Sequence, residues 1–173
     1  EVVGAIPGPT IALRADIDAL PVKEATGLPF VSETEGLMHA CGHDYHTASM
    51  IGAAILLQAK RAQLKGTVRF IFQPAEEIAQ GAKWVEAAGA LEGVSAIFGM
   101  HNKPDLPVGT IGIREGGLMA SADRFELEIH GVGGHAGIPD STIDPIVIAS
   151  QIITGLQTII SRNTSPFHNA VIS

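Results

Sequence analysis

The sequence has little that would suit a secreted, membrane-bound or nucleic-acid-binding protein. Its one cysteine, Cys41, cannot form an internal disulfide and is therefore either a buried thiol or a participant in chemistry. Eleven Lys and Arg against eighteen Asp and Glu give the 173 residues a net charge of -7, which disfavours binding to nucleic acid or anionic lipid. The longest strongly apolar stretch, residues 48–57, is far shorter than the roughly 20 residues of a membrane helix, and no signal-peptide pattern begins the chain. We expect a soluble, cytoplasmic protein with no nucleic-acid or membrane partner.

What the sequence does have is enough apolar material for a packed core. Hydrophobic residues make up 46% of the chain and charged residues 17%, a composition typical of folded rather than disordered proteins. The length allows one domain, or one domain and part of another. The chain starts at Glu1 without a methionine and stops in an apolar stretch, residues 170–173, that looks like the opening of a strand. We therefore expect a fragment of a longer protein.

Strands and helices alternate through the first part of the chain. The expected elements are strands over residues 10–15, 67–72 and 96–100, a loop over residues 16–38, and helices from residue 44 to near 65 and from 82 to 88. The first helix is indicated by apolar residues spaced by three and four. Such alternation favours βαβ units around a mostly parallel sheet, whose sites are usually built at the carboxyl ends of the strands.

The pattern changes after Pro107. Residues 110–114 and 124–129 alternate apolar with polar side chains, which is typical of half-exposed antiparallel strands. Asp144 and Pro145 then supply an N-cap and a first-turn proline for a helix that runs to about residue 160. We therefore place a domain boundary near residue 115, between a first domain over residues 1–114 and the beginning of a second over residues 115–173.

The densest cluster of chemical groups lies in residues 39–46. It contains four possible metal ligands, which are His39, Cys41, His43 and His46. Thiolate and imidazole are groups that a zinc-like ion selects, and Gly42 permits the turn that lets its neighbours converge. The alternative is a buried thiol near surface histidines that cap a helix.

Other acidic residues and a histidine follow the expected strands. Asp16 and Asp18 come after the first strand, Glu76 and Glu77 after the second, and His101 after the third. Paired carboxylates there suit metal-assisted hydrolysis, because one can hold an ion while the other handles a proton. Each signal alone has a simpler explanation, a solvated acidic turn or a structural histidine. Together they predict one site at a single edge of the sheet.

Four motifs carry a family resemblance along nearly the whole chain. They are LRADIDALP at residues 13–21, MHACGHD at 38–44, FQPAEE at 72–77 and GGHA at 133–136. These motifs resemble the metal-dependent amidohydrolases that cleave N-acyl amino acids, hippurate and auxin–amino-acid conjugates, which belong with the aminoacylases and di-zinc exopeptidases. The resemblance implies a catalytic domain with a mixed α/β sheet sandwiched by helices. It also implies an inserted α+β lid domain that mediates dimerisation, so that this chain would hold the first part of each.

The resemblance also implies roles for single residues. It assigns Cys41, His43, Glu77 and His101 as ligands of two divalent ions (Zn, Mn, Co or Ni), Glu76 as the general base, and His135 as an oxyanion-stabilising residue that reaches into the partner subunit. Asp18 lies where related peptidases carry an aspartate that orients a metal-binding histidine, and Asp16 replaces that histidine. Both aspartates are therefore expected behind the ligands. The alternative for His135 is a turn residue in a glycine-rich loop.

The function expected from these assignments is metal-dependent hydrolysis of the amide bond of a small N-acyl amino acid, in a homodimer formed through the lid. The first alternative is a di-metal exopeptidase acting on small peptides. The second is a non-catalytic metal-binding or dimerisation module. The presence of both Glu76 and Glu77 argues against this second alternative, because a structural site needs no spare base. The family's last metal ligand lies beyond residue 173, so the fragment alone is expected to be inactive. Asp140 and residues 78–81 depart from the family pattern, which leaves the preferred substrate open.

Overall fold

The computed structural model describes residues 1–119 and 121–173. Its contacts divide the chain into two compact units, residues 1–112 and 113–173. No helix among the described residues is both long enough and apolar enough to cross a membrane.

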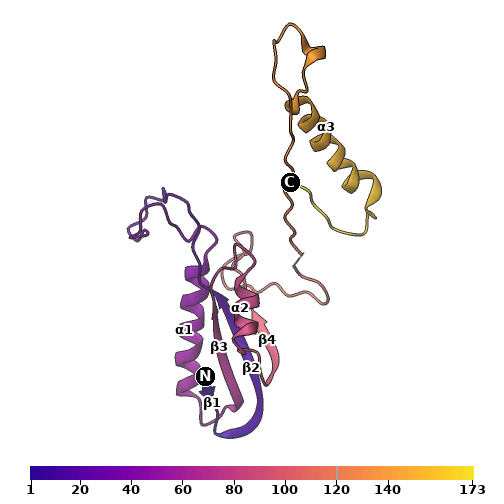
Figure 1. Ribbon diagram of the computed structural model, residues 1–173. Helices are drawn as coiled ribbons and strands as arrows, with labels where there is room; N and C mark the ends of the chain where they lie inside the picture. Colours follow the sequence, from indigo (N-terminus) through magenta and orange to yellow (C-terminus); the bar gives the residue numbers. More distant parts are fainter. Residues whose placement is uncertain (120) are drawn as a thin grey trace. The chain divides into compact units, whose positions relative to one another are not determined.

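A four-stranded mixed sheet forms the centre of the first unit (Figure 1). Its strands are β1 (Val2–Val3), β2 (Ile6–Asp16), β3 (Lys65–Gln73) and β4 (Val94–Gly99), in the spatial order β1-β3-β2-β4. β2 lies parallel to both β3 and β4, whereas the short β1 pairs antiparallel with β3. The three parallel strands therefore end on one side of the sheet, which we call the carboxyl edge.

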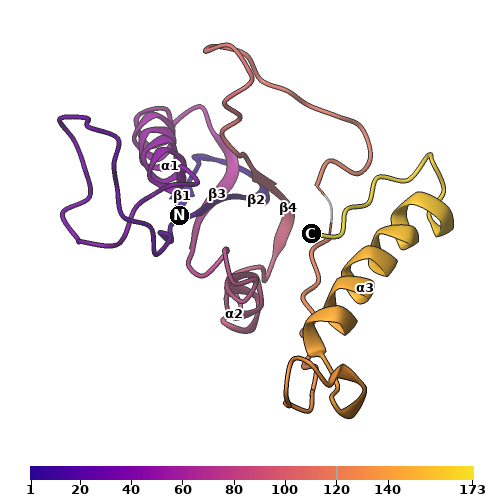
Figure 2. The same ribbon diagram turned by 90° about the horizontal axis from the view of Figure 1, so that it is seen from above.

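Two helices connect the parallel strands and cover opposite faces of the sheet (Figure 2). α1 (His43–Ala59) leads from β2 to β3, and α2 (Gly81–Ala87) leads from β3 to β4. Because β3 and β4 lie on opposite sides of β2, right-handed crossovers bring the two helices to opposite faces. Connections that run over opposite faces of a sheet open a crevice at its carboxyl edge, where α/β proteins bind ligands. The expected mixed α/β sheet with helices on its faces is confirmed.

The buried side chains of this unit are of two kinds. The apolar ones are Val2, Ala12, Ala15, Met50, Val68 and Ile71, and the polar ones are Asp16, His43, His46 and Gln73. All four polar residues lie at the carboxyl edge, where β2 and β3 end and α1 begins. Burying a polar group costs free energy unless it is paired. The concentration of such groups at one edge therefore indicates a function there beyond packing.

The expected strands and helices of the first unit are present, with one correction at the end of α1. The helix ends at Ala59, not near residue 65 as its spacing predicts. The chain after it is bound to the segment that follows β1, since Ala5 and Ile6 donate their N–H groups to the carbonyls of Arg61 and Leu64 at 2.9 and 3.2 Å. Those hydrogen bonds fix residues 61–64 in turns and lead directly into β3.

The second unit contains one long helix. α3 (Pro145–Thr158) follows a turn of 3-10 helix, η1 (Pro139–Ser141), and continues into a π-helical segment, η2 (Ile159–Asn163). The predicted start of this helix is confirmed, because the Asp144 carboxylate accepts a hydrogen bond from the Ile146 N–H at 2.8 Å and Pro145 is the first helical residue. This is the N-cap arrangement that satisfies a free amide of the first turn.

The antiparallel strands predicted over residues 110–114 and 124–129 are wrong. The structure has no strand in either range, and the nearest pairing is an isolated bridge between Val132 and Ile143. Alternating side chains can only form a strand where another strand offers its backbone. The described residues of this unit offer no such neighbour beside either range.

Candidate metal centre

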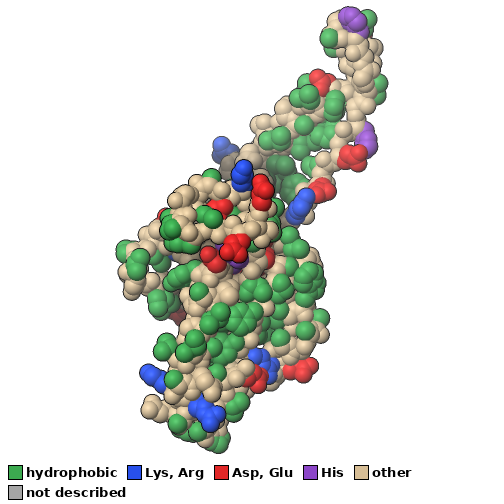
Figure 3. Space-filling view, turned by 90° about the vertical axis from the view of Figure 1, so that its left-hand side faces the viewer, with side chains coloured by type: hydrophobic (Ala, Val, Ile, Leu, Met, Phe, Trp, Pro, Cys, Tyr) green, Lys and Arg blue, Asp and Glu red, His purple; other side chains and the backbone are tan. Residues whose placement is uncertain are grey.

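The ends of β2, β3 and β4 bring together residues that are far apart in the sequence. Asp16 at the end of β2 is in register with Gln73 of β3, and Arg14 is in register with Gly99 of β4. The loops that follow these strands carry the predicted site residues. Acidic and histidine side chains gather at one place on the face of the first unit shown in Figure 3, above a broad hydrophobic surface.

His43 lies at the centre of this group. Its side chain is fully buried, and its Nδ1–H donates to the Asp18 carboxylate at 3.1 Å. Its other ring nitrogen, Nε2, has no hydrogen-bond partner within residues 1–119 and 121–173. That nitrogen lies 3.7 Å from a Glu77 oxygen and 3.9 Å from a Glu76 oxygen. A buried lone pair beside two carboxylates is an environment that a cation would satisfy.

Cys41 and His101 form the other side of the group. The Cys41 Sγ lies 3.4 Å from the His101 Nε2, and the His101 Nδ1–H donates to the Asn102 carbonyl at 2.8 Å. His101 therefore carries its hydrogen on Nδ1, and its Nε2, which has no hydrogen, faces the Cys41 thiol. Burial raises the pKa of the Cys41 thiol, and the Glu77 carboxylate raises it further. Cys41 would bind a metal ion as the thiolate, with the ion taking the place of the proton.

The possible ligand atoms form two overlapping groups. The atoms of Cys41, His43 and His101 lie within 4.8 Å of one another, and so do those of His43, Glu76 and Glu77. We call these five residues the ligand cluster. Thiolate, imidazole and carboxylate together suit zinc and similar divalent ions. The structure thus brings together all four residues predicted as metal ligands, with the predicted base beside them, and the donor set fits two ions.

The two predicted aspartates lie behind the ligand cluster. Asp18 accepts the His43 Nδ1–H with one oxygen and the Glu77 backbone N–H, at 3.0 Å, with the other. A carboxylate behind a histidine fixes which ring nitrogen faces a metal. Asp16 lies on the other side of the same ring, with one of its oxygens 3.7 Å from the His43 Nε2.

Asp16 belongs to a separate buried network. Its oxygens accept from the Nδ1–H of His46 at 2.5 Å and from the Arg14 guanidinium at 2.7 Å. Burial by itself would raise the pKa of Asp16, but the hydrogen bond from His46 and the charge of Arg14 outweigh it and hold the pKa below its usual value. Asp16, His43 and His46 are close enough to suggest a third ligand group. Because Asp16 and His46 already bind each other, we interpret this third group as structural.

His46 is the residue whose part in the site the sequence left unassigned. It is one of four possible ligands in the motif, yet both of its ring nitrogens are occupied, the second by the Asn102 N–H at 2.9 Å. Its spacing from His43 was the available signal, since residues three apart on a helix share a face. The sequence does not show that Asp16 and Asn102 would lie against this face of the helix.

The loop after β3 is tightly folded, which turns both glutamates toward His43. Ala75 and Ala79 adopt left-handed backbone conformations, with φ of 52° and 53°, and non-glycine residues in that region carry strain that is common at functional sites. At Gly81 a Cβ atom would lie 1.6 Å from the Pro74 carbonyl oxygen. Only glycine therefore allows the loop to close.

A second glycine lets the loop after β4 approach the motif of Cys41. Gly42 has φ +87°, and a Cβ there would lie 2.7 Å from the Asn102 side-chain oxygen. Its small size and left-handed conformation let the segment of His101 and Asn102 lie against the start of α1. This close approach is what brings His101 to Cys41.

His135 belongs to the second unit, residues 113–173, whereas the ligand cluster belongs to the first. It lies in a turn in which the Gly137 N–H donates to its Nδ1 at 3.0 Å. Its predicted role as an oxyanion-stabilising residue stays a prediction.

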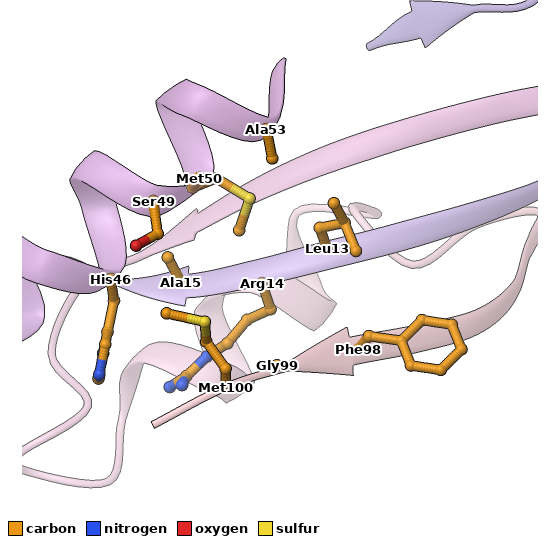
Figure 4. Close-up of a pocket in the computed structure, with 10 residues that line it drawn as sticks. All are labelled: Leu13, Arg14, Ala15, His46, Ser49, Met50, Ala53, Phe98, Gly99 and Met100. Carbon is orange, nitrogen blue, oxygen red and sulfur yellow. The ribbon is translucent and has the colours of Figure 1, made fainter. Parts of the chain in front are cut away.

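An apolar pocket lies beside the centre rather than over its carboxylates. Its volume is about 190 Å³, and it is lined from β2, α1 and β4 by residues such as Leu13, Met50 and Phe98 (Figure 4). His46 and Arg14 border it, but Cys41 and the glutamates of the ligand cluster are not among its lining residues. The groups capable of chemistry are therefore on the carboxyl edge.

An α/β sheet with thiol, imidazole and carboxylate groups converging at its carboxyl edge defines the chain as part of a metal-site protein of the α/β class. The model of Peptidase family M20/M25/M40 matches residues 12–168. The chain belongs to this family, which confirms the resemblance carried by its motifs.

Individual relatives are similar over nearly all of this chain. It is 69% identical over 173 residues to the N-acetylcysteine deacetylase of Bacillus subtilis (strain 168), covering 100% of this chain and 46% of the relative. It is 47% identical over 171 residues to the IAA-amino acid hydrolase ILR1-like 5 of Arabidopsis thaliana, covering 99% of this chain and 39% of the relative. The crystal structure of the Bacillus subtilis YXEP protein, described as a dinuclear metal binding peptidase from the M20 family, is 66% identical, has a TM-score of 0.74, and is matched over 91% of this chain and 42% of its own. The chain thus spans less than half the length of these relatives.

Proposed function

We propose that the protein to which this chain belongs is a metal-dependent amidohydrolase that cleaves the amide bond of small N-acyl amino acids. The observation that carries the proposal is the buried Nε2 of His43, which has no hydrogen-bond partner within the described residues and lies beside the carboxylates of Glu76 and Glu77. The names of the relatives support the substrate class, since they include an N-acetylcysteine deacetylase and an IAA-amino acid hydrolase.

The proposed ligands are Cys41, His43, Glu77 and His101, which would hold two divalent ions. The description of the YXEP protein as dinuclear supports this number, and Zn, Mn, Co or Ni would each suit the donor set. When bound, such ions supply Lewis acidity that polarises an amide carbonyl and acidifies water. Asp18 holds the ring of His43 through Nδ1, which leaves Nε2 facing the ligand cluster.

Glu76 is the proposed general base. It takes a proton from water as the water oxygen attacks the carbonyl carbon, and it passes that proton to the nitrogen as the carbon–nitrogen bond breaks. The products are a carboxylic acid and the free amine of the amino acid. The Glu76 side chain is 41% exposed, against 25% for Glu77. The greater exposure of Glu76 supports its assignment as the carboxylate that contacts a substrate.

An exopeptidase acting on small peptides is the second candidate, because the YXEP protein is described as a peptidase. The same groups would cleave either amide. The two candidates are therefore separated by comparing N-acetyl amino acids and dipeptides as substrates of the same enzyme. A metal-loaded full-length enzyme should show a higher kcat/KM on N-acetyl amino acids than on dipeptides, and it should lose this activity on chelation and regain it on reloading. A higher kcat/KM on dipeptides would favour the exopeptidase, and hydrolysis of neither would contradict the proposal.

We propose that residues 115–173 begin a lid domain that forms a homodimer and carries His135 to the partner's site, and that the protein is cytoplasmic. The glycines beside His135 support the first part, because they permit close approach of another backbone. By the same proposal these 173 residues alone are inactive, since they span less than half the length of the relatives that they match.

A further inference from the structure

His46 is a buried histidine whose two ring nitrogens are bound on opposite sides. It is 2% exposed. Its Nδ1–H donates to the Asp16 carboxylate at 2.5 Å, and its Nε2 accepts the backbone N–H of Asn102 at 2.9 Å. The partners assign the tautomer, since a carboxylate can only accept and an amide N–H can only donate. His46 therefore has no nitrogen left for a metal.

Asn102 connects His46 to a proposed metal ligand. It directly follows His101, and its carbonyl accepts the His101 Nδ1–H at 2.8 Å. One residue thus offers its N–H to His46 and its C=O to His101. The rings of His46 and His101 also contact each other edge to face, with centroids 4.7 Å apart. Two separate contacts therefore tie the orientation of His101 to the position of His46.

The other end of this chain of contacts is fixed in the sheet. Asp16 binds the guanidinium of Arg14 through the oxygen that His46 does not use, and Arg14 in turn donates from Nε to the Gln73 side chain at 2.9 Å. These three residues lie at the ends of β2 and β3. Figure 4 shows the His46 side chain extending from α1 past the carboxyl end of β2. The contacts therefore run from the sheet through His46 to the loop after β4.

We propose that His46 is a positioning residue of the metal centre. It holds the loop after β4 so that the His101 Nε2 faces the Cys41 thiol, 3.4 Å away. Its imidazole suits this role because it is a rigid group with a donor toward Asp16 and an acceptor toward Asn102. The inference deepens the proposed two-metal function and rests on it.

The test compares two substitutions in the full-length protein, His46→Asn and His46→Gln. An asparagine amide reaches about as far as Nδ1 and can still donate to Asp16, but it cannot reach the Asn102 N–H. A glutamine amide reaches about as far as Nε2 and can present its oxygen to that N–H. Loss of a group behind a metal ligand costs about 10- to 100-fold in metal affinity. His46→Asn should therefore weaken one of the two sites by about 10- to 100-fold, and His46→Gln should stay within a few-fold of the wild type.

The readouts are the affinity for each ion, from competition with a chromophoric chelator, and the absorption spectrum of the Co²⁺-loaded protein. The spectrum reports the geometry of the thiolate and imidazole ligands, which a change in overall stability would not move. Met50→Ala is the matched control. Met50 is also buried on α1, at 6% exposure, one turn further along the helix, and its loss should lower the melting temperature without changing ion affinity or the spectrum.

The outcomes separate this inference from the function on which it rests. A wild-type protein that binds fewer than two ions would contradict the proposed function. A wild type with two ions, together with unchanged affinity and spectrum in His46→Asn, would overturn the positioning role alone. Equal weakening by Met50→Ala would also overturn it, by showing a general effect of destabilisation. If His46→Asn does not fold, His46→Gln still decides, because a loss of about 10-fold or more in that variant contradicts the role assigned to its acceptor.

Discussion

The assignment of Glu76 as base and Glu77 as ligand gives the sharpest test of the centre. The two carboxylates lie at nearly equal distances from the His43 Nε2, 3.9 and 3.7 Å, so distance alone does not distinguish them. Their surroundings do. Glu77 is the more buried side chain, and its backbone N–H donates to the Asp18 carboxylate. Its carboxylate also raises the pKa of the Cys41 thiol more than that of Glu76 does. These surroundings support the proposal that Glu77 is the ligand and Glu76 the base.

Replacing Glu76 with glutamine keeps its size but removes the proton acceptor. The expected loss of turnover is about 10²- to 10⁴-fold, the usual contribution of a general acid–base group. Because each tenfold change in rate corresponds to 1.36 kcal/mol of barrier, this is about 3 to 5 kcal/mol. Metal content should stay close to normal, since the proposed ligands remain. Glu77→Gln should instead lose metal and activity together, because its charge helps to hold an ion.

The assay measures kcat on an N-acetyl amino acid and metal content by elemental analysis, in both full-length variants prepared side by side. Each variant serves as the control for the other, since both remove one negative charge from the same loop. Loss of metal in Glu76→Gln with retention in Glu77→Gln would exchange the two roles. Full activity in Glu76→Gln would refute the reasoning, because this variant lacks the proposed proton acceptor.

Three further predictions concern the metal, the lid and the fold. Cys41→Ala should weaken at least one ion site by no less than the about 10- to 100-fold cost of losing a supporting group, and full stoichiometry with unchanged affinity would contradict its role as a ligand. If His135 acts in trans, inactive His135→Ala and Glu76→Ala variants of the full-length protein should regain activity as mixed dimers, and no recovery despite proven subunit exchange would remove that assignment. Gly81→Ala should lower the melting temperature sharply, because its Cβ would overlap the Pro74 carbonyl oxygen at 1.6 Å, and calorimetry showing wild-type stability would mean that the loop can shift at little cost.

The sequence predicts the first unit well because its signals are local. Apolar runs of strand length alternate with a helical period, and βαβ geometry then fixes where the loops after the strands meet. That rule predicts that Glu77 and His101 lie at the same edge of the sheet as the loop that leads to Cys41. The helix end at Ala59 could not be predicted this way, since it depends on hydrogen bonds from residues 5 and 6 to residues 61 and 64. The strands predicted over residues 110–114 and 124–129 failed for the same reason, because a strand exists only with a partner.

The site shows the same limit at the level of single atoms. The sequence identifies histidines near one another, but it does not say which ring nitrogen each leaves free. His43 and His101 have Nδ1 bound to an oxygen acceptor, so their Nε2 atoms face the ligand cluster. His46 has the same hydrogen on Nδ1, yet an amide N–H occupies its Nε2. What separates the proposed ligands from the proposed positioning residue is therefore the partner of the Nε2 atom. That partner is Asn102, which is 56 residues away in the chain and brought close only when β4 joins the sheet beside β2.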